Sequence, residues 1–567
     1  MKKLLTFVCG LFLFSLCGKA QTASFETATE AVQNMKVGWN LGNTLESVKS
    51  GNNGSPEDFE TAWGQPVTRP ELMRMMKNAG FNAIRVPVTW FQHMDANNTV
   101  DAVWMARVHE VVDYVINQGM YCILNVHHDT GADDSAWLVA DESVYNQQKA
   151  RFESLWTQIA TEFRDYDEHL LFEAYNEMLD VKDSWCFASF NASGSYDAAI
   201  ATSAYNAINS YAQSFVDVVR ATGGNNAQRN LVVSTYGACS GGGTWNPHLK
   251  DPLKQMKLPN DNVQGHIIFE IHSYPNVKNI QSTKSEIDDM LDAAVTYLAS
   301  KGAPVIFGEW GTANDGENDY EVRRANVLEF ARYFVQKSKE KGIGTFYWMG
   351  LSDGQARLWP VFNMPDVAES ILKAWYGDSY KPVLPVVEDF DYDYTVVTYY
   401  SQWSELNLYS GDPLSLSQYK GVRVELAETP QSGLLSVKCY GASDGKETYN
   451  GVSSEQMTVN FNSGSLGQSV RRITLQCGKG GTNTAKVVRA VLLKTDGTEV
   501  ETSLSPYWGC RITDIEATQN SSGVSAIGSA ECYDRPLGWW TLDGRQLETA
   551  PTSAGIYIHN GQKVVRR

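Results

Sequence analysis

Short apolar runs alternate with helical patterns over the first two thirds of the chain, and this alternation restricts the fold more than any other feature. Each run has the length and composition of a buried strand. The runs lie at residues 36–43, 83–88, 121–126, 170–178, 230–234, 267–271, 304–307 and 344–348. The helical patterns lie at residues 69–79, 104–117, 147–163, 204–222, 284–301 and 323–341.

Eight such repeats over residues 25–378 predict an α/β fold, a (β/α)8 TIM barrel. A doubly wound sheet is the alternative, but no glycine-rich phosphate loop follows the first run. A barrel requires functional side chains to follow the carboxyl ends of its strands. Polar and aromatic residues do follow the runs in turn: Asn43, His93, His127, His128, Asp129, Asn176, Glu177, Tyr236, His272, Tyr274, Glu309 and Trp348.

Two of these residues are glutamates that end apolar runs directly, Glu177 in the fourth run and Glu309 in the seventh. A carboxyl group at the end of a buried strand is partly desolvated, which raises its pKa toward the range of a general acid. Alternatively, Glu177 is a solvated loop residue. Two strand-end glutamates in one chain instead suggest the paired carboxylates of a glycosidase.

Arg85 lies inside the second run, so its side chain points into the barrel or the floor of the site. A buried charge needs a partner, and Glu309 is the natural one. We expect this pairing to keep Glu309 ionised, as a nucleophile requires.

The ordered motifs resemble glycoside hydrolase family 5, and most of all its subfamily 4 of endo-β-1,4-glucanases and xyloglucanases. The resemblance spans the whole barrel. It rests on the segments at residues 38–44, 85–90, 125–129, 172–177, 272–275 and 308–311. The chain departs from the family pattern at Met178, where a proline is usual, and at Trp348-Met349-Gly350, where Trp-Asp-Asn is usual.

The resemblance implies that Glu177 is the acid/base and Glu309 the nucleophile. It also implies that Asn176 binds the sugar 2-hydroxyl and that Arg85 and Tyr274 orient the nucleophile. Residues around the −1 subsite would be His127, His272 and the stacking ring of Trp348. We also place Asn43, His93 and His128 among the substrate-binding residues because of their positions after strands.

Other chemistries have less support. His127-His128-Asp129 lacks further ligands at metal spacing, so we expect neither a metal nor another cofactor. Ser240-Gly241-Gly242-Gly243 is not the nucleophile elbow of an esterase. The 47 basic and 65 acidic residues give a net charge of −18, which disfavours nucleic acid as a partner.

The chain is too long for one core, and its ends carry export signals. Residues 1–20 form a signal peptide, with a basic start, an apolar stretch and a Gly18-Lys19-Ala20 cleavage site. No other segment is apolar and long enough to span a membrane. Residues 524–567 resemble the C-terminal sorting domain of the type IX secretion system, which implies an outer-membrane secretion machinery as a partner. The alternative is a small terminal β-module.

A proline-containing linker at residues 379–387 precedes short alternating segments at 388–514. These segments predict an all-β sandwich of jelly-roll type. Behind a glycosidase barrel it resembles a carbohydrate-binding module, with Trp403, Tyr440 and Tyr449 as candidate rings. A purely structural sandwich is the alternative.

Together these features predict a secreted, monomeric, retaining endo-β-1,4-glucanase that acts on cellulose, mixed-linkage glucan or xyloglucan. The alternatives on the same site are a xyloglucan-specific endoglucanase, a lichenase and a mannanase. A non-catalytic polysaccharide-binding surface protein is the alternative from another class, but binding alone does not need two such glutamates.

Overall fold

The computed structural model describes residues 24–133, 135–190, 195–312, 320–443 and 445–519, together with short strands between residues 539 and 566. The predicted signal peptide and most of the predicted sorting domain lie outside the described residues. Within the described residues, no helix has the length and apolar character needed to cross a membrane.

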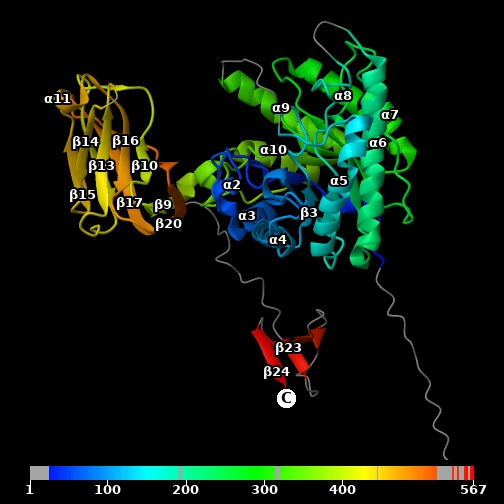
Figure 1. Cartoon of the computed structure of the whole chain (residues 1–567), viewed down its shortest axis with the longest axis horizontal. Helices are drawn as coiled ribbons and strands as arrows, with labels where there is room; N and C mark the ends of the chain where they lie inside the picture. The colour runs from blue at the N-terminus through cyan, green and yellow to red at the C-terminus, as the bar shows by residue number, and fades with distance from the viewer. Residues whose placement is uncertain are drawn as a thin grey trace, which may run out of the picture.

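Eight parallel strands close into a barrel in chain order, with helices around its outside (Figure 1). β1 pairs with β8 and completes the ring. The strands are β1 (Gly38–Asn40), β2 (Ala83–Val86), β3 (Tyr121–Asn125), β4 (Leu170–Glu173), β5 (Leu231–Cys239), β6 (Ile267–Ser273), β7 (Val305–Trp310) and β8 (Gly344–Tyr347). The (β/α)8 prediction is confirmed.

The helices that cover this barrel start and end at recognisable signals. Pro70 opens α3, and Asp101 and Asp141 cap α4 and α5 by accepting backbone N–H groups. The helices are α1 (Ala28–Met35), α2 (Pro56–Glu60), α3 (Pro70–Ala79), α4 (Ala102–Ile116), α5 (Glu142–Glu162), α6 (Ala198–Ala221), α7 (Asp251–Gln255), α8 (Ile280–Tyr297), α9 (Tyr320–Glu340) and α10 (Pro365–Tyr376). The sequence prediction started α5 and α6 several residues late; the polar first turn of α5 carries no apolar periodicity.

Two antiparallel sheets follow the barrel and pack into a sandwich, drawn in yellow and orange in Figure 1. The first sheet has the order β14 (Glu447–Gly451), β13 (Leu435–Gly441), β16 (Ser469–Cys477), β10 (Glu405–Tyr409), β19 (Ser505–Trp508). The second has the order β15 (Gln456–Asn460), β12 (Tyr419–Leu426), β17 (Asn483–Lys494), β9 (Phe390–Tyr399), β20 (Cys510–Gln519). β20 therefore continues past residue 514, where the sequence prediction ended the sandwich.

Polar contacts join the barrel to the sandwich. Arg69 of the barrel forms an ion pair of 2.8 Å with Asp514, and Arg511 of the sandwich pairs with Asp58. Leu358 packs into the sandwich core although it follows the last barrel strand. The described strands near the carboxyl end, β21 (Trp539–Thr541), β22 (Gln546–Leu547), β23 (Gly555–His559) and β24 (Gln562–Arg566), form a separate sheet.

Candidate active site

The inside of the barrel is built in two layers, because alternate residues of a strand point to the same side. The lower layer is apolar and packs against α1. It contains Ala83, Ile123, Leu171, Val232, Ile268 and Ile306. Two positions further along the strands, the upper layer contains Arg85, Asn125, Glu173, Ser234, Glu270 and Gly308. This polar layer is the floor of the candidate site.

Arg85 is fully buried and organises the floor. Its Nε and Nη2 donate to the two carboxylate oxygens of Glu173 at 2.6 and 2.7 Å, and its Nη1 donates to Glu309 at 2.8 Å. Its Nε also lies 3.3 Å from Glu270. Burial opposes the charge, but the three carboxyl groups outweigh it and raise the pKa of Arg85 well above its usual value. The predicted pairing of Arg85 with Glu309 is present.

Sequence reasoning missed Glu173 and Glu270 as members of the site. Each interrupts an apolar run, and a charge in such a run requires a buried partner, so the signal was available. Glu270 accepts a 2.8 Å hydrogen bond from the Ser234 hydroxyl. The next strand makes room with Gly308, where an added Cβ would lie 1.5 Å from Glu270 Oε1.

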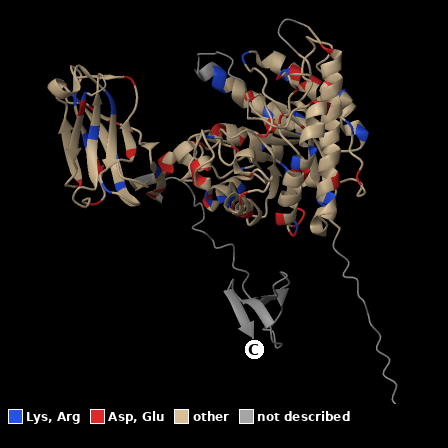
Figure 2. Cartoon of the chain, in the orientation of Figure 1, with Lys and Arg blue, Asp and Glu red and all other residues tan. Residues whose placement is uncertain are grey.

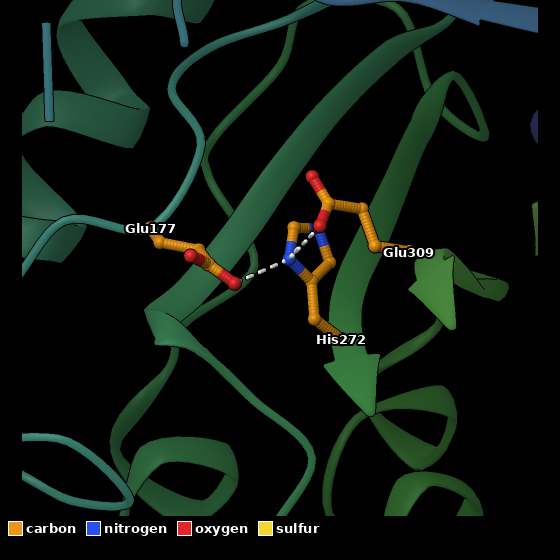
Figure 3. Close-up of side chains that lie close together, drawn as sticks. All are labelled: Glu177, His272 and Glu309. Atoms are coloured by element: carbon orange, nitrogen blue, oxygen red, sulfur yellow. Dashed lines mark hydrogen bonds and ion pairs between the residues drawn. The ribbon is translucent and has the colours of Figure 1, made fainter. Parts of the chain in front are cut away.

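Glu177 and Glu309 lie on either side of His272 at the mouth of the barrel (Figure 3). His272 Nδ1 lies 2.8 Å from Glu177 Oε1 and 3.6 Å from Glu309 Oε2. One oxygen of each glutamate and a ring nitrogen of His272 all lie within 4.8 Å of one another.

Burial and neighbouring charges act in opposite directions on the pKa values of Glu177 and His272. Two cations, Arg85 and His272, face four carboxyl groups among the described residues. Burial raises the pKa of Glu177, although the hydrogen bond with His272 opposes the rise. Burial would lower the pKa of His272, but Glu309 and the hydrogen bonds with Glu177 and Glu270 raise it to about 10.

Glu177, His272 and Glu309 are also residue types that can ligate a metal ion. With a pKa of about 10, His272 carries protons on both ring nitrogens at neutral pH. A doubly protonated ring has no lone pair to offer a metal. The chemistry of this cluster therefore suits proton transfer.

Several other predicted residues surround the two glutamates. The Tyr274 hydroxyl donates to Glu309 Oε2 at 2.6 Å, and Asn176 Oδ1 accepts from Arg85 at 2.7 Å. His127 Nε2 lies 3.8 Å from Glu309, and its ring stacks parallel to Trp348 with centroids 5.8 Å apart. Burial lowers the pKa of His127 well below its usual value, so this ring is neutral.

The remaining predicted residues lie further out. His128 contacts the rings of His127 and Trp63, which extends the aromatic lining beyond Trp348. Asn43 follows β1 with a φ of 59°, and its backbone N–H is held by Glu46. His93 is not brought together with the glutamates. It stacks on Trp104 with centroids 3.6 Å apart, away from the floor.

A cavity of about 340 Å³ opens beside Glu177, His272 and Tyr274. Its outer wall includes Trp185 and Trp245, which are 43% and 61% exposed. Flat exposed rings next to a carboxylic acid suit a ligand with both apolar faces and hydroxyl groups.

The cellulase (glycosyl hydrolase family 5) family model matches residues 48–353. The chain belongs to glycoside hydrolase family 5. As a family 5 member it is a glycosidase, and the matched segment contains Arg85, Glu177, His272 and Glu309.

Individual family 5 proteins match part of this chain, and the chain spans less than two thirds of the length of the first curated relative. Endoglucanase A of Clostridium longisporum is 35% identical over 347 residues, which span 58% of this chain and 60% of that protein. A GH5-4 broad specificity endoglucanase from an uncultured bacterium has a solved structure with 55% identity and a TM-score of 0.61. The match covers 64% of this chain and 98% of that one.

The family 5 enzyme of Prevotella bryantii, solved with a xyloglucan tetradecasaccharide, is 40% identical with a TM-score of 0.57. That match covers 62% of this chain and all of the solved chain. The family and the endoglucanase relationship are thus shown for the barrel, and the sandwich lies outside the residues that the family model matches.

Proposed function

We propose that this protein is a secreted endo-β-1,4-glucanase that hydrolyses internal bonds of a plant β-glucan with net retention at the anomeric carbon. The main support is the spacing of Glu177 and Glu309, whose nearest oxygens lie within 4.8 Å. Retaining glycosidases hold their two carboxyl groups about 5–5.5 Å apart, whereas inverting enzymes need about 6.5 Å or more to admit a water.

In the first step the Glu309 carboxylate attacks the anomeric carbon, while Glu177 gives its proton to the leaving glycosidic oxygen. Arg85 and Tyr274 hold both oxygens of Glu309 and fix its direction of attack. In the second step Glu177 takes a proton from a water molecule, the water oxygen bonds to the anomeric carbon, and the bond from that carbon to Glu309 breaks. In this proposal Trp348 supplies the flat ring beneath the sugar, and Asn176, which accepts a hydrogen bond from Arg85, binds the 2-hydroxyl.

The test is a substrate panel with a stereochemical readout. Reducing ends are measured on carboxymethylcellulose, mixed-linkage glucan, xyloglucan, glucomannan and xylan, and proton NMR follows the first anomer formed from a cello-oligosaccharide. We expect release from the β-glucans and the β-anomer first. An α-anomer in the first spectra would exclude the retaining mechanism, and activity on none of the polymers would exclude the proposal.

Xyloglucan is the second candidate substrate. The Prevotella bryantii enzyme, which resembles this chain at 40% identity, was solved with a xyloglucan tetradecasaccharide. A higher kcat/KM on xyloglucan than on unbranched mixed-linkage glucan would favour this candidate, and the reverse order would favour the unbranched chain.

The alkaline limb of the pH profile of kcat/KM should follow the loss of the proton from Glu177. Activity falls as pH rises through the pKa of Glu177, because the first step needs its proton. His272 holds that pKa down, so His272→Phe is expected to move the alkaline limb of kcat/KM to higher pH. A limb that stays in place, or moves to lower pH, would contradict this assignment.

A substrate with a leaving group that needs no protonation provides the control for this experiment. With a dinitrophenyl cellobioside the first step does not depend on Glu177, so both the parent and His272→Phe should lose the alkaline limb. A limb that persists with this substrate would belong to another group.

Secretion forms part of the proposal and rests on the sequence. The support is the signal pattern at residues 1–20 and the sorting-domain resemblance at residues 524–567. In the native host we expect the protein outside the cell, with an amino terminus near Gln21. Amino-terminal sequencing and intact mass of the extracellular protein test both ends, and retention of residues 1–20 would contradict the signal assignment.

A further inference from the structure

The outward face of the sheet β14-β13-β16-β10-β19 has an unusual composition for a solvated surface. Alternate residues such as Leu406 and Val437 enter the sandwich core. Their outward neighbours are polar, yet each is less than a tenth exposed. They are Glu405, Asn407, Lys438, Thr474 and Gln476. We call this set the polar centre.

Exposed aromatic rings border the polar centre on both edges of the sheet. Tyr449 on β14 lies directly opposite Lys438, and Trp508 on β19 lies directly opposite Glu405. These rings are 57% and 54% exposed. Tyr507, on the same edge as Trp508, is 46% exposed. The guanidinium carbon of Arg472 lies over the Tyr507 ring, 3.8 Å from the ring centre. A flat face with rings at its borders and hydrogen-bonding groups between them fits a chain of pyranose rings.

Hydrogen bonds fix the polar centre in place. Glu405 accepts from the hydroxyls of Tyr440 and Thr474 at 2.5 and 2.9 Å, and from Gln476 Nε2 at 2.7 Å. Lys438 Nζ lies 3.5 Å from Glu405 and 3.5 Å from Glu447. With Arg472 included, two cations and two carboxylates share the face. The balance of charge favours a neutral ligand over a phosphate or an acidic peptide.

One polar atom of this centre has no partner. Asn407 is 7% exposed, and its Nδ2 donates to Ser505 Oγ at 3.2 Å. Its Oδ1 has no hydrogen-bond partner in the part of the chain that the structure describes. A buried unpaired acceptor costs free energy unless a ligand completes it, and a sugar hydroxyl is a suitable donor.

The outward face of the other sheet shows what an ordinary solvated surface looks like in this sandwich. There Arg423 pairs with Glu499, and Arg489 pairs with Glu425 at 2.8 Å. Tyr394 is an aromatic residue on this second face, and Lys486 Nζ lies 5.4 Å from the centre of its ring. Figure 2 shows basic and acidic residues interspersed over the sandwich as a whole, so charge alone does not distinguish the two faces.

We propose that the outward face of β14-β13-β16-β10-β19 is a second binding site for a neutral polysaccharide chain, separate from the catalytic barrel. The choice of β-glucan as that polysaccharide rests on the proposed function. Tyr449 and Trp508 stack on sugar rings, and Asn407 accepts from a sugar hydroxyl between them.

β19 lies next to the barrel, so a polysaccharide bound at this edge of the sheet lies near the catalytic domain. Gln355 Nε2 donates to Leu504 O at 2.7 Å, directly before β19 begins. Gln355 and Trp348 both lie in the segment that follows β8. A polymer bound at the β19 edge is therefore held beside the barrel, which raises its local concentration at the catalytic cleft.

The test measures binding of the full chain to polysaccharide by affinity electrophoresis in native gels. The parent carries Glu309→Gln to stop hydrolysis and Trp348→Ala to weaken binding in the cleft. Gels contain mixed-linkage glucan, xyloglucan or hydroxyethylcellulose, with dextran as the α-linked comparison. We expect Tyr449→Ala/Trp508→Ala to weaken retardation by β-glucan about tenfold, because two ring contacts are lost.

Matched variants separate binding from folding. Tyr394→Ala, on the other sheet, should bind like the parent, and Trp508→Phe should retain most of the affinity because it keeps a flat ring. All variants must share the parent's thermal unfolding midpoint. Equal retardation of the parent and the double variant, or no retardation of the parent in any gel, would overturn the proposal. Failure of the wild-type sequence, with Glu309 and Trp348 intact, to hydrolyse glucans would remove the proposed function but leave this binding result standing.

Discussion

Replacing Glu309 with alanine is expected to lower kcat on β-glucan by about 10⁵-fold, because the covalent route needs this carboxylate. Azide is expected to restore turnover of an aryl cellobioside and to yield the α-glycosyl azide. The anion would enter the space left by the carboxylate and attack the anomeric carbon once, from the face opposite the leaving group. Product configuration is read by NMR.

With azide, the Glu177→Ala variant should give a glycosyl azide of the opposite anomeric configuration to the one from Glu309→Ala. With an activated aryl leaving group the first step needs no acid, so the glycosyl-enzyme on Glu309 forms and then accumulates. Azide attacks that intermediate from the other face and gives the β-glycosyl azide. Glu162→Ala, at the exposed end of α5, serves as the control and should keep wild-type kcat. If the two azide products were exchanged between the variants, the two roles would also have to be exchanged.

The sequence carried enough information to predict the barrel and its two glutamates. Each parallel strand is buried on both sides, so it appears as a continuous apolar run, and the residue after each run lies at the barrel mouth. The sequence pattern therefore groups Glu177, His272, Tyr274 and Glu309 at one end of the barrel.

The floor beneath these residues was harder to predict. Arg85 was assigned one carboxylate partner, but it contacts three, because residues on β4 and β6 point inward at the same height. Layering of this kind depends on the register between strands, which a single sequence does not state. Glu173 and Glu270 could have been found from the rule that a charge within an apolar run needs a buried partner.

His93 shows that a position after a strand in the sequence does not by itself place a side chain in the site. It follows the second strand at some distance, but the short η1 helix (Phe91–His93) turns its ring onto Trp104 and Phe59. The sandwich edge strand β19 was also missed, because Ser505-Pro506-Tyr507-Trp508 contains a proline and is too short to alternate clearly. Tyr449 was a candidate ring from the sequence, but Trp508 became one only when strand pairing placed it opposite Glu405.

Replacing Arg85 with methionine is expected to lower the free energy of unfolding at neutral pH by about 3–5 kcal/mol, since it leaves buried carboxylates without their cation. Activity should be lost as well, because Arg85 orients Glu309. Urea unfolding followed by tryptophan fluorescence measures the first effect, and hydrolysis of an aryl cellobioside measures the second.

The pH dependence of the lost unfolding free energy shows whether the buried carboxylates left by Arg85→Met cause the loss. Burial already raises the pKa of Glu173 to about 7 although Arg85 opposes the rise, and Arg85 helps to hold the pKa of Glu270 below its usual value. Without Arg85 the pKa of Glu173 rises further and that of Glu270 rises above the unfolded value of about 4.3. The folded variant then binds more protons than the unfolded chain, so its stability falls as pH rises through that window. The difference in unfolding free energy between wild type and Arg85→Met should therefore grow from about pH 4 to about pH 8.

Arg229 provides a matched control, because it is equally buried but its hydrogen bonds go to neutral groups. It donates to the backbone carbonyls of Leu170 and Tyr166 at 2.6 and 2.8 Å and to Asn226 Oδ1 at 2.7 Å. Arg229→Met should also destabilise the barrel, but it leaves no buried carboxylate to titrate, so its loss should stay nearly constant over the same pH range. A constant loss for Arg85→Met as well would mean that Arg85 supports the fold by packing and that the charge network contributes little.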